Sequence, residues 1–405
     1  MSMALEGIRV LDWTIWQQGP VGTAMLGDLG AEVIKLEARD GGDPARGMMR
    51  LSGRDLGGRP NFYFETNNRN KKSIALDLKA PEAREIVYDL VRHCDVFAQN
   101  FRVGVAERLG LDYATLRRYN PRLIYAHATG FGPKGPEAAQ PVMDQIGIAR
   151  SGLMMAVGEP GTPPQPINGG IADQTSGIML AYGVLAALVA RERHGVGQQV
   201  DVSQLGSMAA LQGLNLSARL MMGAELPRVD RSAAGNPLYN HYRCADDRWI
   251  VLSMPQAARH WPAFCRAIGR ADLEHDPLFV EILWNSSVEA RARVALLDEV
   301  FASRPLHEWL RILGEASPDF LFSPVNSVDD LPNDPQVRAN DYVVGFDHPQ
   351  YGPIEMTGFP VGLSETPCTI REAAPEFGQH TEEILLELPG YDWERLAELR
   401  RLEVI

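Results

Sequence analysis

The chain has 405 residues, of which 45% are hydrophobic, enough to form a large buried core and more than one compact domain. Its 39 basic and 52 acidic residues give a formal net charge of −13, which argues against nucleic acids or anionic membranes as partners. An anionic ligand must therefore be held by basic residues that gather locally.

The amino-terminal residues show no basic stretch followed by an apolar run, so no signal peptide is expected. No uncharged apolar segment reaches the roughly 20 residues of a membrane-spanning helix. The longest one, 177–190, is followed by Arg191 and is interpreted as a buried helix. The four cysteines are widely separated and form no CxxC pair, so neither disulfides nor a metal site is expected. We expect a cytoplasmic protein.

Strands alternate with helices in the first half of the chain, the pattern of a parallel sheet covered on both faces. In chain order, the expected strands are 9–13, 32–37, 73–78, 95–100, 123–129 and 199–203. Between them we expect helices over 22–30, 81–93 and 175–194, the last ended by Gly195, and a long helix over 203–222 after the final strand.

The character of the sequence changes near residue 226. Short strands such as 249–254 and amphipathic helices such as 290–302 indicate a smaller domain that ends near residue 326. A hairpin over 341–358 and a helix over 378–388 then form a third section. We therefore divide the chain into the ranges 1–222, 226–326 and 327–405.

The first strand, turn and helix invite comparison with a dinucleotide-binding site, in which a strand ending at Glu37 would hold a ribose. However, the glycines at 19, 22, 27 and 30 do not form the GxGxxG pattern, and Gln17-Gln18-Gly19-Pro20 occupies the turn. The turn then offers backbone N–H groups that either cap the helix or bind an oxyanion.

Basic residues cluster locally within 68–73 and again at Lys79, Arg102 and Arg108. All follow or flank expected strand ends, where open parallel sheets bind ligands, so a phosphate-rich ligand is plausible. For Lys71 and Lys72 individually, a solvated basic face is the simpler interpretation.

Asp173 lies just before the long apolar helix, in Asn168-Gly-Gly-Ile-Ala-Asp173. Aspartate is a favoured N-cap residue, so capping is the default interpretation of its position. The same position would keep the carboxylate ionised, with glycines leaving room for a carbonyl group, and an ionised carboxylate can act as a nucleophile toward an activated acyl group.

An ordered set of motifs runs along most of the chain and includes 7–12, 27–37, 70–79, Asn100-Phe101, 120–124, Asp173 with Gly177, 195–198 and 378–385. Their order and spacing are more specific than any single motif. Taken together, these stretches resemble the class III CoA-transferases, the CaiB/BaiF family typified by formyl-CoA and carnitine CoA-transferases.

The resemblance implies an α/β fold in which 1–222 and 327–405 form a Rossmann-like large domain and 226–326 a smaller α+β domain. It also implies a homodimer whose two subunits are interlocked. The expected substrates are an acyl-CoA and a carboxylic acid, with no permanently bound cofactor and no metal.

In such an enzyme Asp173 attacks the acyl-CoA to form a mixed anhydride and release the CoA thiolate, which returns to give an aspartyl-CoA thioester. The acceptor acid then attacks this thioester to form a second anhydride, and attack of the thiolate on that anhydride yields the new acyl-CoA. Gln17, in the turn near the reacting carbonyl, is the second catalytic candidate, through oxyanion stabilisation. The positions that match the CoA-binding set of the family are Gln18, Arg39, Leu76, Lys79, Asn100, Phe101, Arg102 and Arg108.

Departures from the family pattern affect the assignment of Arg39 and the choice between transfer and racemisation. Ala38 stands where an arginine often follows the second strand, which makes Arg39 its candidate replacement. The related α-methylacyl-CoA racemases need a histidine base in Gly-His-Asp, whereas this chain has Val142-Met143-Asp144. We therefore favour transfer over racemisation, and we interpret Asp144 as a helix-start cap. A non-catalytic CoA-binding protein is the alternative from another class.

Overall fold

The computed structural model describes residues 2–51, 54–280 and 288–405, which fold into two compact units. The first unit consists of Met1–Met154, Pro166–Glu225 and Arg338–Ile405, and the second of Met155–Gln165 and Leu226–Val337. The second unit thus takes in a short excursion of the chain at 155–165 and continues beyond residue 326 to Val337.

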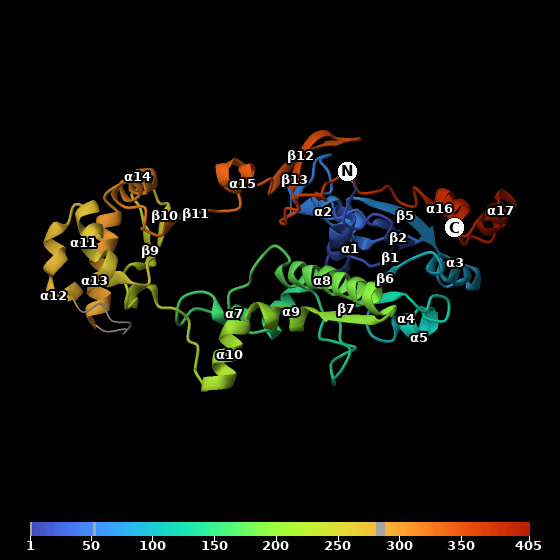
Figure 1. Cartoon of the computed structure of the whole chain (residues 1–405), viewed down its shortest axis with the longest axis horizontal. Coiled ribbons are helices and arrows are strands. Elements are labelled where there is room, and N and C mark those ends of the chain that lie inside the picture. Colours follow the sequence, from blue (N-terminus) through green and yellow to red (C-terminus); the bar gives the residue numbers. More distant parts are fainter. Residues whose placement is uncertain (1, 52–53, 281–287) are drawn as a thin grey trace. The chain divides into compact units, whose positions relative to one another are not determined.

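The first unit is built on a six-stranded parallel sheet with the strand order β5-β2-β1-β6-β7-β8 (Figure 1). Its strands are β1 (Arg9–Trp13), β2 (Glu32–Ala38), β5 (Lys71–Leu76), β6 (Val96–Gln99), β7 (Ile124–Thr129) and β8 (Gln199–Ser203). The expected mixed α/β fold with a large parallel sheet is confirmed.

Helices cover both faces of this sheet, because alternate residues along each strand are apolar on either side. Leu11 and Ile34 face a core shared with α3 (Pro81–Val91), α16 (Thr381–Glu387) and α17 (Trp393–Arg401). Val10 and Val33 face a second core shared with α1 (Gln18–Asp28) and α8 (Ile171–His194). The carboxyl-terminal end of the chain therefore completes the first unit, and α17 was not expected from the sequence.

The remaining elements of this part of the chain are short. They comprise α2 (Phe62–Asn68), α4 (Val105–Leu109), α5 (Tyr113–Leu116), α6 (Asp144–Arg150), α7 (Leu153–Ala156), α9 (Gln204–Leu211), α10 (Gly213–Met222), a 3-10 turn (Pro44–Gly47), the strand pairs β3 (Arg50–Leu51) with β4 (Arg54–Asp55) and β12 (Val343–His348) with β13 (Gly352–Thr357).

The expected single helix over 203–222 is wrong, because the chain breaks between α9 and α10. Gln212 leaves the helical conformation, with φ −94° and ψ 19°, and its side-chain amide donates to the carbonyl oxygen of Ser151. Gly213 follows directly, and glycine has a low helix propensity.

The second unit is an α+β structure around a three-stranded antiparallel sheet with the order β11-β10-β9. Its core gathers Trp261, Phe264, Phe301 and Trp309 between helices and sheet. The elements are β9 (Tyr239–Arg243), β10 (Trp249–Ser253), β11 (Phe322–Val325), α11 (Ala257–Ala267), α12 (Pro277–Val280), α13 (Val288–Phe301), α14 (Leu306–Ala316), α15 (Pro335–Ala339) at its end, and the 3-10 turns Arg231–Ala233, Ala271–His275 and Leu331–Asn333.

Helices α1 and α8 approach each other closely enough that two glycines are required at the contact. A methyl group on Gly22 would lie 2.8 Å from the carbonyl oxygen of Gly177, and one on Gly177 would overlap Val21 and lie 2.8 Å from the carbonyl oxygen of Gln18. Backbone therefore packs on backbone here. In the described part of the chain, α8 alone is long and apolar enough to cross a membrane, and one face of this helix packs on α1 and the sheet.

Buried charges lie beneath the carboxyl end of β1, and they correct one interpretation of the sequence. Lys71 is not a solvated surface residue but fully buried, and its ammonium group lies 2.8 Å from Asp12 Oδ2. Lys35 is equally buried, pairs with Asp43 Oδ2 at 2.8 Å and donates to the carbonyl oxygen of Thr14. Paired charges of this kind are retained because removing one partner leaves the other desolvated and unpaired.

The glycine contact makes a first prediction. Gly177→Ala should lower the free energy of unfolding by about 1–3 kcal/mol, because overpacking forces α1 and α8 apart. The measurement is a denaturant or thermal midpoint. Gly314→Ala, also within a helix, is the matched control, since a methyl group there would meet only Phe322, at an ordinary contact distance of 3.8 Å, and should leave stability unchanged or slightly higher. Equal stability of Gly177→Ala and the wild type would show that the helices do not need this contact.

Candidate active site

The carboxyl ends of the strands converge on the point where the strand order reverses, between β1 and β6. From there, β2 and β5 extend to one side, and β7 and β8 to the other. Open parallel sheets bind ligands at such a switch point. Asn100, which follows β6, bridges the gap by bonding both the backbone N–H and the carbonyl oxygen of Ile15, which follows β1, each at 2.9 Å.

The turn after β1 is held in an uncommon conformation by the buried charges. Trp16 has a φ of 64°, a left-handed conformation that bulky residues rarely adopt. Its N–H donates to Asp43 Oδ1 at 3.1 Å, while Lys35 holds the carbonyl oxygen of Thr14 at 2.9 Å. The turn delivers Gln17 to the start of α1.

Gln17 is brought next to the start of α8. A methyl group on Gly170 would overlap the Gln17 side-chain amide, and Gly170 also has a φ of 67°, so only glycine suits this position. Within the described residues the amide of Gln17 forms no hydrogen bond with another side chain or backbone group. It is therefore free to donate to a ligand.

Asp173 does not cap α8, in contrast to the default interpretation of its position. The helix begins at Ile171, which places Asp173 inside the first turn. Asp144 supplies the cap instead: its Oδ1 accepts from the N–H groups of Ala172 at 2.7 Å and Asp173 at 3.2 Å. Asp144 is thus a helix-start cap as expected, but for α8 rather than for α6, on which it lies.

The carboxylate of Asp173 is half-buried and forms no ion pair within the described part of the chain. Its Oδ1 accepts a 2.6 Å hydrogen bond from Gln204 Nε2. Burial, together with the negative charge of Asp144, raises the pKa of Asp173 to about 7, although the bond from Gln204 opposes this shift. The sequence suggested a fully ionised carboxylate, but the carboxylate of Asp173 titrates near neutral pH. A pKa raised in this way is typical of functional sites.

Two residues near Asp173 were not predicted from the sequence. Gln204 directly follows β8 and reaches back to the carboxylate. Tyr63 lies on α2, and burial together with the charges of Asp173 and Asp43 raises the pKa of its phenol, which places it in the same electrostatic environment. Neither residue belongs to a short motif, so only the fold brings them to the site.

The expected CoA-binding residues fall into two groups. Those of the first group contact other parts of the chain. Gln18 is buried and donates to the carbonyl oxygen of Thr129 at 2.9 Å. Leu76 is fully buried in the core at the end of β5. Phe101 packs on Trp13 with ring centroids 4.2 Å apart, beside Asn100.

The second group, Arg39, Lys79, Arg102 and Arg108, is exposed. These cations follow β2, β5 and β6, at or just beyond the same edge of the sheet as Gln17. Among the described residues none of them forms an ion pair with a carboxylate side chain; Arg39 donates to the backbone oxygen of Ile405. A cavity of about 700 Å³ opens beside Arg39 and Ile405.

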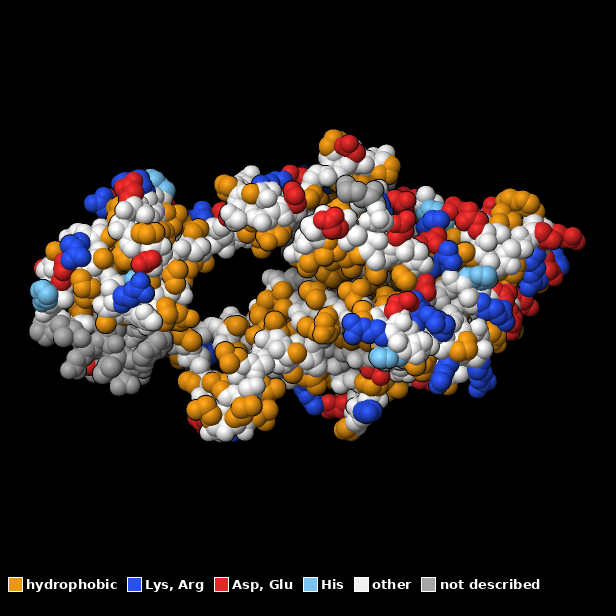
Figure 2. Space-filling view, viewed as in Figure 1, with side chains coloured by type: hydrophobic (Ala, Val, Ile, Leu, Met, Phe, Trp, Pro, Cys, Tyr) orange, Lys and Arg blue, Asp and Glu red, His pale blue; other side chains and the backbone are white. Residues whose placement is uncertain are grey.

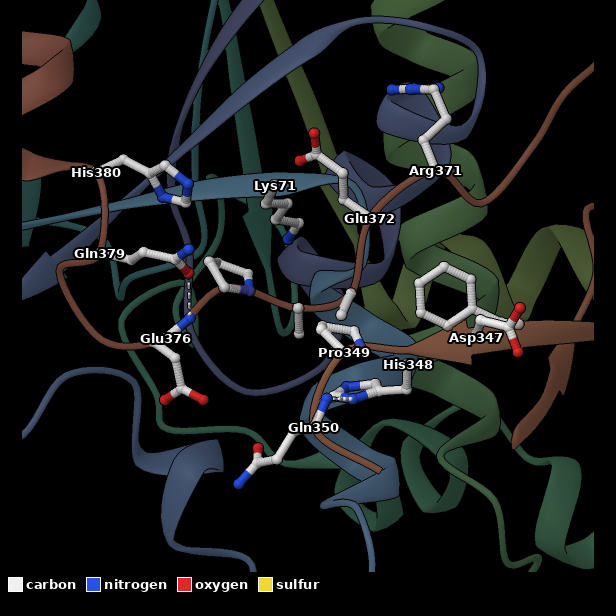
Figure 3. Close-up of a pocket in the computed structure, with 14 residues that line it drawn as sticks. Lys71, Asp347, His348, Pro349, Gln350, Arg371, Glu372, Glu376, Gln379 and His380 are labelled. Atoms are coloured by element: carbon white, nitrogen blue, oxygen red, sulfur yellow. Dashed lines mark hydrogen bonds between the residues drawn. The ribbon is translucent and has the colours of Figure 1, made fainter. Parts of the chain in front are cut away.

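A separate cavity of about 760 Å³ lies between the hairpin β12–β13 and the segment 371–380 (Figure 3). Its lining includes His348, Glu372 and His380, and none of the predicted site residues. In the described part of the chain, no group of three or more His, Cys, Asp or Glu side chains is arranged to hold a metal ion.

Comparison with known proteins agrees with this arrangement. The family model for CoA-transferase family III matches residues 5–381. The (R)-2-hydroxy-4-methylpentanoate CoA-transferase of Clostridioides difficile is 32% identical over 406 residues and covers 100% of both chains. The formyl-CoA:oxalate CoA-transferase of Streptomyces coelicolor is 32% identical over 426 residues, again with 100% of both chains covered.

Among solved structures, a CaiB/BaiF family protein from Brucella suis superposes with a TM-score of 0.81 and 28% identity, covering 96% of this chain and 100% of that one. The residues that the family model matches, 5–381, belong to both units of the fold and include the strand ends described above. The chain therefore belongs to CoA-transferase family III, the CaiB/BaiF family, and its class of activity is CoA transfer.

Proposed function

We propose that this enzyme transfers CoA from an acyl-CoA to a carboxylic acid through covalent intermediates on Asp173. The observation that carries the proposal is a carboxylate without an ion-pair partner in the described structure, in the first turn of a helix whose preceding residue, Gly170, packs against the Gln17 amide. A carboxylate whose pKa is near 7 is a stronger nucleophile than an ordinary one and is still ionised in about half of the molecules at neutral pH.

In the first step, an oxygen of Asp173 attacks the thioester carbonyl, the C–S bond breaks, and CoA leaves as the thiolate. The thiolate then attacks one of the two carbonyl groups of the mixed anhydride. Because the less basic carboxylate leaves more readily, the raised pKa of Asp173 favours attack at Cγ of Asp173 and departure of the donor acid. The resulting aspartyl-CoA thioester reacts with the acceptor acid by the same steps in reverse order.

Gln17 is assigned to the substrate side of this reaction. Its uncommitted amide lies against Gly170, three residues before Asp173, where a donor can stabilise the oxyanion that forms on the acyl carbonyl. The exposed cations Arg39, Lys79, Arg102 and Arg108 along the same edge are assigned to the CoA phosphates. Asn100 acts by fixing the turn that carries Gln17.

The racemase alternative lacks support at the position where it needs a second base. Met143 is 58% exposed and directly precedes α6. A thioether cannot accept a proton from a carbon acid at neutral pH, so Asp173 has no histidine partner at this position for proton transfer. Transfer is the function that the arrangement of side chains supports better.

We also propose that the enzyme is a homodimer of interlocked subunits. The support is α10, which buries none of its residues within the chain and exposes Leu214, Leu220, Met221 and Met222 by 75–86%. Figure 2 shows apolar side chains gathered over this helix. Apolar surface of this kind is typical of a protein interface, and a second copy of the chain is the partner that the family resemblance indicates.

The assembly can be measured by light scattering or sedimentation. We expect twice the mass of one chain, and no dissociation on dilution while the protein stays folded, because interlocked subunits cannot separate without unfolding. A monomer of full activity at any concentration would contradict the proposed dimer.

Asp173→Asn should reduce transfer at least about 10³-fold, because an amide cannot form the anhydride. Asparagine keeps an oxygen for the bond from Gln204, so the thermal midpoint should stay close to that of the wild type. The assay follows conversion of donor acyl-CoA to acceptor acyl-CoA by mass spectrometry, with α-deuterium uptake in D2O recorded in the same samples. Full transfer by the variant, or deuterium uptake by the wild type without transfer, would refute the proposal.

The activity should fall as the pH falls through about 7, because the nucleophile must be ionised and the pKa of Asp173 is raised to about 7. Asp144→Asn removes a negative charge that contributes to this shift and keeps an oxygen for the cap, so the acid limb of kcat/KM should move to lower pH. Asp392→Asn, at the cap of α17, is the matched control and should leave the limb in place. An unmoved limb in Asp144→Asn would refute this account of the shift.

A further inference from the structure

Gln204 is the side chain that holds the carboxylate of Asp173. It is the first residue of α9, directly after β8, and it is 3% exposed. Its Nε2 donates to Asp173 Oδ1 at 2.6 Å, a short bond of the kind that forms with a charged acceptor. No other side-chain hydrogen bond to the Asp173 carboxylate occurs in the described structure.

The surroundings of Gln204 leave its amide little freedom. A methyl group on Gly147 would overlap Gln204 Oε1 and lie 3.0 Å from its Cβ, so the side chain is packed directly on the backbone of α6. Oε1 is buried and has no hydrogen-bond partner among the described residues. Burying Oε1 without a hydrogen-bond partner costs free energy. The bond from Nε2 to Asp173 and the packing on α6 must outweigh this cost, and these two contacts therefore set the position of the amide.

We propose that Gln204 is the oxyanion donor for the steps in which the carbonyl group of Asp173 itself is attacked. The inference rests on the proposed covalent mechanism and assigns a separate donor to each of its two reacting carbonyls. Gln17 serves the substrate carbonyl, and Gln204 serves the aspartyl carbonyl.

The chemistry follows from which oxygen is held. With Oδ1 bound by Gln204, Oδ2 is the oxygen that attacks the acyl-CoA and becomes the bridging atom of the anhydride. The CoA thiolate then forms a bond to Cγ, and the electron pair of the C=O bond moves to Oδ1. When the carbonyl reforms, the bond from Cγ to the bridging oxygen breaks, and the donor acid leaves as its carboxylate.

The negative charge in this step develops on Oδ1, next to the Nε2–H group of Gln204. A carbonyl oxygen of an anhydride is a weak acceptor and an oxyanion is a strong one, so the bond strengthens toward the transition state and accelerates this step selectively. Attack of the acceptor acid on the aspartyl-CoA thioester passes through the same oxyanion.

The test separates the two chemical stages in a rapid-quench experiment. The full-length enzyme is mixed with acyl-labelled donor acyl-CoA in the absence of acceptor, and loss of acyl-CoA and release of free donor acid are timed separately. In Gln204→Met, which has a similar length and no donor, acid release should slow on the order of 10²-fold. Loss of acyl-CoA should slow much less, so the acylated Asp173 should accumulate.

A second readout is the pH profile. Because the bond from Gln204 lowers the pKa of Asp173, its removal should move the acid limb of kcat/KM to higher pH, opposite to Asp144→Asn. Gln204→Asn keeps an amide that is too short to reach Oδ1 and should behave like Gln204→Met, which carries the test if either variant folds poorly. Gln212→Leu, the same residue type at the end of α9, should change neither readout, because its amide bonds only backbone carbonyls.

Equal slowing of both stages, or unchanged acid release in a folded variant, would overturn the role of Gln204. These outcomes differ from a failure of the covalent mechanism itself, in which the wild-type enzyme would carry no acyl group on Asp173 at any time.

Discussion

The site depends on the close approach of α1 and α8, which pack backbone to backbone through Gly22 and Gly177. This contact starts the two helices side by side, so that Gln17 before α1 lies against Gly170 before α8. Both amino ends, with their positive dipole ends, then point to the edge of the sheet where strand order reverses. A side chain larger than hydrogen at any of these glycines would separate the groups that the reaction needs together.

Around this contact, charged side chains fix the turn that carries Gln17 and set the pKa of Asp173. Lys35 and Asp43 hold the turn that carries Gln17, and both are out of contact with water. On the opposite side, burial and Asp144 raise the pKa of Asp173, while Gln204 opposes the shift and orients the carboxylate. The carboxylate of Asp173 is therefore sufficiently ionised to attack the thioester, and it is more basic than the donor acid, which leaves the anhydride more readily.

The alternation of strands with helices predicted most of the first unit, and the ordered motifs predicted the family. Local sequence could not show which groups would be neighbours. Asp144 caps a helix that begins 27 residues later in the chain, and Lys71 looked like surface because its partner Asp12 is distant in sequence. The break at Gln212 depends on Ser151, and Gln204 reaches Asp173 only because β8 adds to the sheet beside β7. Tertiary contacts decided each of these cases.

Covalent acylation of Asp173 is tested most directly by oxygen exchange. A single turnover with an acceptor acid labelled with oxygen-18 in its carboxylate should leave one oxygen-18 atom on Asp173, because the bridging oxygen of the second anhydride comes from the acceptor and stays with the enzyme. Peptide mapping by tandem mass spectrometry locates it. Transfer that proceeds with no oxygen-18 on Asp173, or with the label on another carboxylate, would contradict the account.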